Sequence, residues 1–134
     1  MTVANALLTY EQIGKKLLAI ASTILRQPIL PVSLPAHIRA EQPGRYVDQI
    51  HAALQIQDDG AGAVVLTDSH AATPDNRARH FSAECDARIV SGVNLPMWLR
   101  VLHYRRQPLQ HLCETANSGD RSGIQLCEQR PGNL

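Results

Sequence analysis

AGAVVLTDSHAATPDN, residues 61–76, is the stretch that decides the fold of this chain. Its apolar run, residues 63–66, has the length of a strand buried on both faces and is too short for a core helix. A polar loop follows at once, and Thr73 with Pro74 is typical of an N-cap and a first helical residue. A strand, a polar loop and a helix start in this order indicate the ligand-binding edge of an open parallel sheet, where helix N–H groups can hold an anion.

The rest of the chain alternates between strand and helix patterns. Further strands are predicted at residues 3–9, 29–34 and 87–91, with a last short one at 124–127. Helices are predicted at residues 13–25, 46–56, 73–83, 97–104 and 109–119. Pro31 restricts the strand at 29–34 to an edge of the sheet. We therefore expect one α/β domain, residues 1–134, with a doubly wound, mainly parallel sheet and helices on both faces.

The helix at 13–25 is expected to pack on the sheet through one apolar stripe. Its members are spaced by three and four residues, and Leu18 and Ile20 widen the stripe. The stripe consists of Ile13, Leu17, Ala21, Ile24 and Leu25.

Composition limits the classes of function. With 44% hydrophobic residues, 19% charged residues and a net charge of +1, the chain of 134 residues is typical of a globular protein. It has no long basic run and only 4% aromatic residues, so we expect no nucleic-acid partner. Glu11, Lys15 and Lys16 interrupt the N-terminal apolar stretch, which excludes a secretory signal or a membrane span there. We expect a cytoplasmic protein without direct membrane insertion.

The cysteines and histidines do not form a recognisable metal or disulfide pattern. Cys85, Cys113 and Cys127 are an odd number without CxxC spacing, which favours reduced thiols. No histidine pair has the HxxxH spacing of a metal site, and neither a GxGxxG nor a P-loop motif is present. We therefore predict no metal and no cofactor.

Three stretches in the expected order resemble one family. They are residues 7–9 with the helix that follows, residues 65–76, and SGVNLPM at residues 91–97. The ending GDRSGI, residues 119–124, follows the same pattern. The chain resembles a mannose-type (mannose/fructose/sorbose family) enzyme IIA component of the bacterial phosphoenolpyruvate-dependent sugar phosphotransferase system.

The resemblance implies a fold, a reaction and partners. Members have a doubly wound sheet and are usually homodimers, often with an antiparallel C-terminal edge strand exchanged between subunits. A histidine after the first strand takes a phosphoryl group from the phosphocarrier protein HPr and passes it to a IIB component. Carried over by position, Asp68 would hydrogen-bond that imidazole, and backbone N–H groups at Ala72 and Thr73 would meet the phosphoryl oxygens. Asn94 and Pro96 would shape the loop beside the site.

The chain departs from the family at the phosphoacceptor, where Tyr10 stands in place of histidine. A phenol, with a pKa of about 10, is mostly protonated at pH 7 and forms a stable ester, so Tyr10 is not expected to relay phosphate. Ala71 and Ala72 replace the usual glycine pair, and Asp75 adds a negative charge nearby. We therefore expect a degenerate, regulatory member, a pseudoenzyme in which Tyr10 donates a hydrogen bond to Asp68. Whether any enzymatic activity remains stays open at this point.

Two alternatives remain. His70, two residues after Asp68, is a second candidate phosphoacceptor in a working phosphocarrier, although no group that would orient it can be named. A sensor of small anions or sugar phosphates, built from Asp68, Thr73 and Tyr10, also fits the fold. The alternative for Asp68 is a purely structural role, as a carboxylate at the end of a strand that caps a helix N-terminus.

Two features beyond the expected site have interpretations of their own. Trp98 is expected in packing or in a dimer interface rather than in ligand binding. Arg100, Arg105 and Arg106 form a basic patch that is either a solvated face or a docking surface for an acidic partner.

Overall fold

The computed structural model describes residues 2–9, 12–26, 32–35, 60–69 and 87–127, with Ala52, Leu54, Gln55 and Arg79 in addition. The strands in this part are β1 (Ala4–Thr9), β2 (Val32–Pro35), β3 (Ala63–Thr67) and β4 (Ala87–Ser91). Its longer helices are α1 (Ile13–Leu25), α4 (Leu95–His103) and α5 (Leu109–Gly123). The helices predicted at 46–56 and 73–83 fall mostly outside the described residues, although Leu54 and Arg79 are helical.

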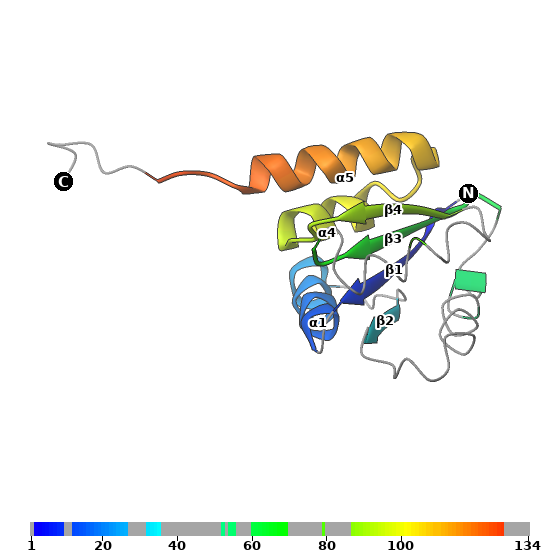
Figure 1. The fold of residues 1–134 in the computed structure, drawn as a ribbon, viewed down its shortest axis with the longest axis horizontal. Helices are drawn as coiled ribbons and strands as arrows, with labels where there is room; N and C mark the ends of the chain where they lie inside the picture. Colours follow the sequence, from blue (N-terminus) through cyan, green and yellow to red (C-terminus); the bar gives the residue numbers. More distant parts are fainter. Residues whose placement is uncertain are drawn as a thin grey trace, which may run out of the picture.

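The strands form one parallel sheet in the order β2-β1-β3-β4 (Figure 1). The chain moves to one side of β1 to form β2, and to the other side to form β3 and β4. The winding therefore reverses between β1 and β3, which is where open α/β sheets bind their ligands. Strand β2 is an outer strand of the described sheet, as its neighbouring proline predicted.

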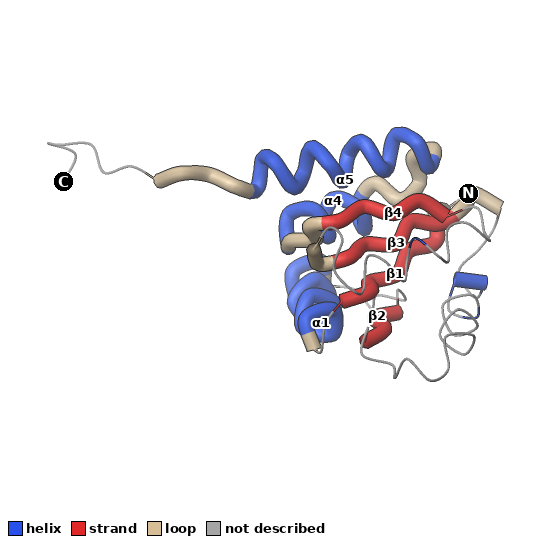
Figure 2. Tube along the Cα trace, in the orientation of Figure 1, coloured by secondary structure: helices blue, strands red, loops and turns tan. Residues whose placement is uncertain are grey.

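Buried side chains form a cluster on each face of the sheet, so the predicted doubly wound architecture is confirmed. Figure 2 shows the strands in red and helices α1, α4 and α5 in blue. On one face, residues such as Leu7 and Leu66 pack against α1, α4 and α5. Strand residues alternate between faces, so Ala6 and Val65 point to the opposite side, where Leu54 packs on them. Strand β3 is buried along its whole length, as expected for an inner strand.

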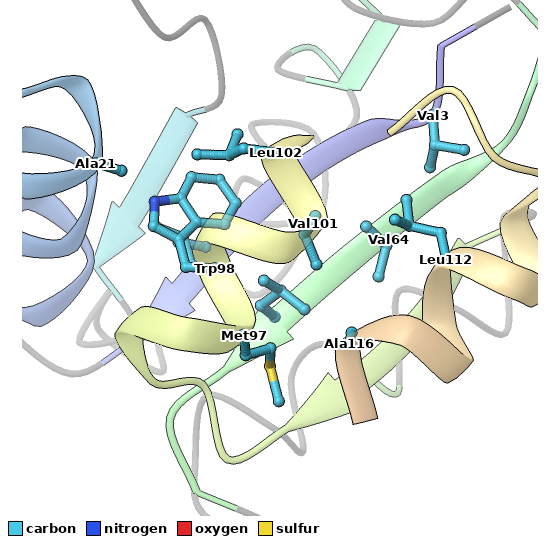
Figure 3. Close-up of a cluster of buried hydrophobic side chains, with 11 residues drawn as sticks. Val3, Ala21, Val64, Met97, Trp98, Val101, Leu102, Leu112 and Ala116 are labelled. Carbon is cyan, nitrogen blue, oxygen red and sulfur yellow. The ribbon is translucent and has the colours of Figure 1, made fainter. Parts of the chain in front are cut away.

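Trp98 of α4 is the largest fully buried side chain in the described part. Its indole lies beside Ala21 of α1 (Figure 3). The interpretation of Trp98 as a packing residue is therefore confirmed, because the indole has no exposed surface.

Helix α1 buries only part of the predicted stripe: Ala21 is buried, and Leu17 and Leu25 pack against the core. Gly14 and Ala21 are its buried residues, whereas Ile13, Ile20 and Ile24 are exposed. Small residues allow the helix axis to come close to the core, so the buried face is centred on Gly14 and Ala21. The isoleucines lie at its border, and the prediction that Ile13 and Ile24 face the sheet was wrong.

The end of the chain also differs from the prediction. Helix α5 continues through Gly119 to Gly123, because a glycine inside a helix costs only about 1 kcal/mol relative to alanine. Residues 124–127 are extended and are not assigned to a strand, so the last predicted strand is not formed within this chain. Helix α4 begins at Leu95, two residues earlier than predicted. None of the helices in the described part is long and apolar enough to cross a lipid bilayer.

Candidate functional site

The candidate site lies at the carboxyl ends of β1 and β3, where the winding of the sheet reverses. The register pairs Leu8 of β1 with Thr67 of β3, so the two strands end at the same edge. Thr9 and Asp68 each follow these paired residues directly. Position 10, the phosphoacceptor position by family resemblance, directly follows β1 in the sequence, and Asp68 directly follows β3. Because β1 and β3 are paired neighbours, their carboxyl ends lie side by side.

Thr9 ties the end of β1 to the start of α1. The backbone N–H of Gly14 donates to Oγ1 of Thr9 over 2.8 Å, and both residues are buried. Gln12 occupies the N-cap position of α1 but makes no side-chain capping hydrogen bond. Thr9 therefore satisfies one of the free N–H groups of the helix from three residues before the N-cap, and this bond joins residues on either side of position 10 in the sequence.

Asp68 is half-buried at the end of β3. Its Oδ1 accepts a hydrogen bond from the backbone N–H of Ser69 over 3.0 Å. This bond holds the carboxylate against the backbone that directly follows β3. A carboxylate held at this edge can accept a further hydrogen bond, which is the property that its proposed role requires.

The loop after β4 is fixed to the end of β3. The backbone N–H of Val93 donates to the carbonyl oxygen of Thr67 over 2.9 Å. Gly92 precedes it with a φ of 84°, a left-handed conformation in which a side chain would be strained. The loop that leads to Asn94 is thereby held beside the candidate site.

Asn94 caps α4 and uses the N–H groups of its first turn. Oδ1 of Asn94 accepts from the Met97 N–H over 2.9 Å, and its carbonyl accepts from the Trp98 N–H over 3.0 Å. Pro96, in the same turn, has no N–H. Helix α4 therefore retains little capacity to bind an anion at its N-terminus.

The last residue of α5 packs against Pro96. A Cβ atom added to Gly123 would lie 2.7 Å from Cγ and 2.9 Å from Cβ of Pro96, closer than real Cβ contacts. The absence of a side chain at Gly123 thus lets the end of α5 approach the first turn of α4. Gly123, the second glycine of the GDRSGI ending, therefore has a packing role beside this loop.

The described residues include only part of the predicted site. Asp68, Asn94 and Pro96 are described and lie at the ends of β3 and β4, whereas Tyr10, His70, Ala72 and Thr73 lie outside the described residues. Sequence reasoning did not assign roles to Thr9 and Gly123. A threonine that ends an apolar strand shortly before a helix start is a usable signal for Thr9. The role of Gly123 depends on a contact between distant segments.

The residues that the structure describes form neither a metal-binding cluster nor a disulfide. They contain no group of three His, Cys, Asp or Glu side chains that could hold a metal ion. Cys113 is half-buried in α5 and Cys127 is exposed, and both are free thiols. Burial raises the pKa of the Cys113 thiol above its ordinary value, with Arg88 lowering it and Glu114 raising it to smaller extents.

Comparison with known proteins assigns the family. The model of the family described as PTS system fructose IIA component matches residues 7–115, from β1 into α5. The chain belongs to this family. No curated protein sequence matches this IIA-family chain.

Solved structures share the fold of this IIA-family chain at low sequence identity. The mannose/sorbose-specific IIA subunit of the phosphotransferase system from Enterococcus faecalis has a TM-score of 0.79 and 19% identity, over 97% of this chain and 98% of its own. Phosphotransferase system component EIIA from Streptococcus agalactiae has a TM-score of 0.77 and 18% identity, over 91% and 95%. The PTS IIA protein associated with the fucose utilization operon from Streptococcus pneumoniae has a TM-score of 0.74 and 15% identity, over 94% and 93%.

Proposed function

We propose that this chain is a mannose-type IIA domain that has no phosphoryl relay of its own and acts by binding another protein of the sugar phosphotransferase pathway. The observation that carries the proposal is Tyr10, which follows β1 at the position of the family's phosphoacceptor histidine. HPr and a IIB component are the partners that family membership suggests, and the cytoplasm is the compartment.

The chemistry of the two side chains explains the loss of activity. A neutral imidazole nitrogen attacks phosphorus without first losing a proton, and the resulting phosphoramidate is labile enough to pass its phosphoryl group on. A phenol, with a pKa of about 10, must be deprotonated before it attacks, and its phosphate ester is stable. Positioning and charge stabilisation supply most of the catalysis in phosphoryl transfer, but they do not replace a missing acceptor.

The surroundings of position 10 support a retained scaffold with an altered acceptor. The Gly14 N–H donates to Thr9 Oγ1, which joins residues on either side of position 10, and the Asp68 carboxylate lies at the neighbouring strand end. In the proposal, the Tyr10 hydroxyl donates to the Asp68 carboxylate in place of the imidazole N–H. This interaction would hold the site in one arrangement without turnover.

Intact mass spectrometry after incubation with phosphoenolpyruvate, enzyme I and HPr tests the proposal. We expect the mass of the chain to stay unchanged while HPr becomes phosphorylated. A gain of one acid-labile phosphoryl group would overturn the proposal. In that case His70→Ala decides the acceptor, since loss of the label in this variant would assign the relay to His70.

We also propose a homodimer, formed when residues 124–127 of one copy add to the sheet of another. Ile124 and Leu126 are 71% and 85% exposed, and they alternate with polar neighbours as a strand with one buried face would. The segment extends away from the body of the molecule (Figure 1). Strand β4 is an outer strand of the described sheet and offers an edge on which such a segment can pair.

A further inference from the structure

Helix α1 presents an apolar stripe to solvent. Ile13, Ile20 and Ile24 are 46%, 44% and 51% exposed. Spacings of seven and four residues put the three side chains on one side of the helix, next to the buried face. Isolated exposed apolar residues are common, but a row of isoleucines along one helix marks a surface that can bind a partner.

The stripe ends in a groove between the last turns of α1 and α4. The groove has a volume of about 350 Å³ and is lined by Ile24, Leu25, Leu99, Arg100, His103 and Tyr104. Tyr104 is half-exposed, and its ring meets the ring of His103 edge to face, with centroids 4.6 Å apart. An aromatic ring that is already positioned by a neighbour suits an anchor in a binding groove.

The groove lies away from the candidate site. Helices α1 and α4 both begin shortly after strands that end at the carboxyl edge of the sheet, where the site lies. A helix rises about 1.5 Å per residue, so Ile24 lies about 16 Å along α1 from Ile13. A partner seated in the groove would leave the edge with position 10 and Asp68 accessible.

The two helices that border the groove, with the residues that follow α4, carry positive charge. Residues 12–26 and 95–113 contain no Asp or Glu, and their six Lys and Arg residues are Lys15, Lys16, Arg26, Arg100, Arg105 and Arg106. Arg100 lines the groove, and exposed Arg26 directly follows Leu25 of the lining. A second copy docked through the same surface would bring these cations together, which opposes self-association.

We propose that the groove between α1 and α4, with the isoleucine stripe leading to it, docks an acidic amphipathic helix of a partner protein. Apolar residues of that helix, spaced by three and four positions, would fill the groove and cover Ile24 and Tyr104. Flanking Glu and Asp residues would face the basic rim. This docking is independent of whether position 10 carries phosphate.

Fluorescence anisotropy with two designed peptides tests the proposal. Both are labelled helical peptides with leucines on one face, and they differ only in carrying glutamate or lysine at the flanking positions. We expect the glutamate peptide to bind, with an affinity that falls as salt is added, and the lysine peptide to bind at least about tenfold more weakly.

Two α1 variants with the same change of charge locate the binding surface. Ile24→Asp should weaken the glutamate peptide by at least about tenfold, because it places a carboxylate in the groove. Ala19→Asp, at an exposed position on another side of α1, should retain most of the binding. Both replaced residues are exposed, and circular dichroism verifies that both variants fold.

Four outcomes would overturn the proposal. One is absence of binding by the glutamate peptide, and another is equal binding of the two peptides. A third is binding that Ile24→Asp leaves unchanged, or that both variants lose alike. The last is evidence for another occupant of the groove. A membrane surface would be indicated by binding of phosphatidylserine vesicles without binding of the peptide. A second copy of the chain would be indicated by self-association in sedimentation experiments that Ile24→Asp abolishes.

Discussion

Thr9 shows how one hydroxyl group connects the sheet to the candidate site. Its Oγ1 is the acceptor for the buried N–H of Gly14, in a turn where the N-cap residue supplies no side-chain acceptor. Thr9→Val keeps the shape of the side chain and removes the acceptor. We expect the free energy of unfolding to fall by about 1–3 kcal/mol, because a buried N–H loses its partner. Urea denaturation of the variant measures this change.

Thr23→Val is the matched control for that experiment. Oγ1 of Thr23 donates to the carbonyl of Ala19 over 3.1 Å at an exposed position of α1. Water can replace this bond, so we expect a change within about 0.5 kcal/mol. Equal effects of the two substitutions would contradict the structural role given to Thr9.

The two described cysteines should differ in reactivity. Alkylation requires the thiolate, and burial raises the pKa of the Cys113 thiol, whereas Cys127 is exposed. At pH 8 we expect iodoacetamide to label Cys127 at least about tenfold faster. The rate at Cys113 should continue to rise at alkaline pH. Peptide mass spectrometry after timed labelling measures both rates, and equal rates would contradict the burial of Cys113.

The raised pKa of Cys113 also has a defined effect on stability. The unfolded chain ionises this thiol first, at a pKa of about 8.5. The contribution of the protonated thiol to folding is therefore complete below that pH and declines as the pH rises above it. Cys113→Ser should reduce the alkaline loss of stability, as measured by thermal unfolding across pH.

At the level of elements, Asn94 determines where α4 begins. Its Oδ1 caps the Met97 N–H, and its extended backbone ends the loop from β4. Asn94→Ala should lower the free energy of unfolding by about 1 kcal/mol, whereas Asn94→Ser should retain most of the stability. Chemical denaturation of the three proteins makes the comparison. An alanine variant as stable as the serine variant would contradict the capping role.

The same elements show what the sequence can predict. The short apolar run at 63–66 and the proline next to β2 were sufficient to predict an inner strand and an edge strand, because these depend on local composition. The buried face of α1 was predicted only in part: Ala21, Leu17 and Leu25 pack in the core as expected. Ile13 and Ile24 do not, because hydrophobicity alone does not reveal that Gly14 lies on the buried face. The end of α5 was placed too early, because a glycine pattern cannot tell an interior position from a helix end.

The candidate site follows a similar division. Asp68 was a candidate because it follows a predicted strand, at the edge that the ends of parallel strands share. Asn94 was a candidate through the family resemblance. Two contacts at the site depend on tertiary packing: the bond from the Gly14 N–H to Thr9 and the contact between Gly123 and Pro96. No residue spacing in the sequence predicts the contact between Gly123 and Pro96. Roles for Tyr10 and Thr73 remain predictions.

For the whole molecule, the apolar ending predicts association. Leu126→Glu should convert the proposed dimer into a monomer, because it places a charge on the face of residues 124–127 that would be buried against a second copy. Gln125→Glu adds the same charge to the opposite face of an extended segment and should leave the dimer intact. Analytical ultracentrifugation at matched concentrations distinguishes these results. A wild-type monomer, or loss of the dimer in both variants, would contradict the proposal.

The proposed function depends on the absence of a phosphoryl relay at position 10. Its most direct test is the acid-labile phosphate content of wild type and Tyr10→His after incubation with phosphoenolpyruvate, enzyme I and HPr, measured as intact mass. We predict that wild type gains nothing, whereas the histidine variant gains one phosphoryl group through the retained scaffold. An acid-labile phosphoryl group on the wild-type chain would contradict the central claim.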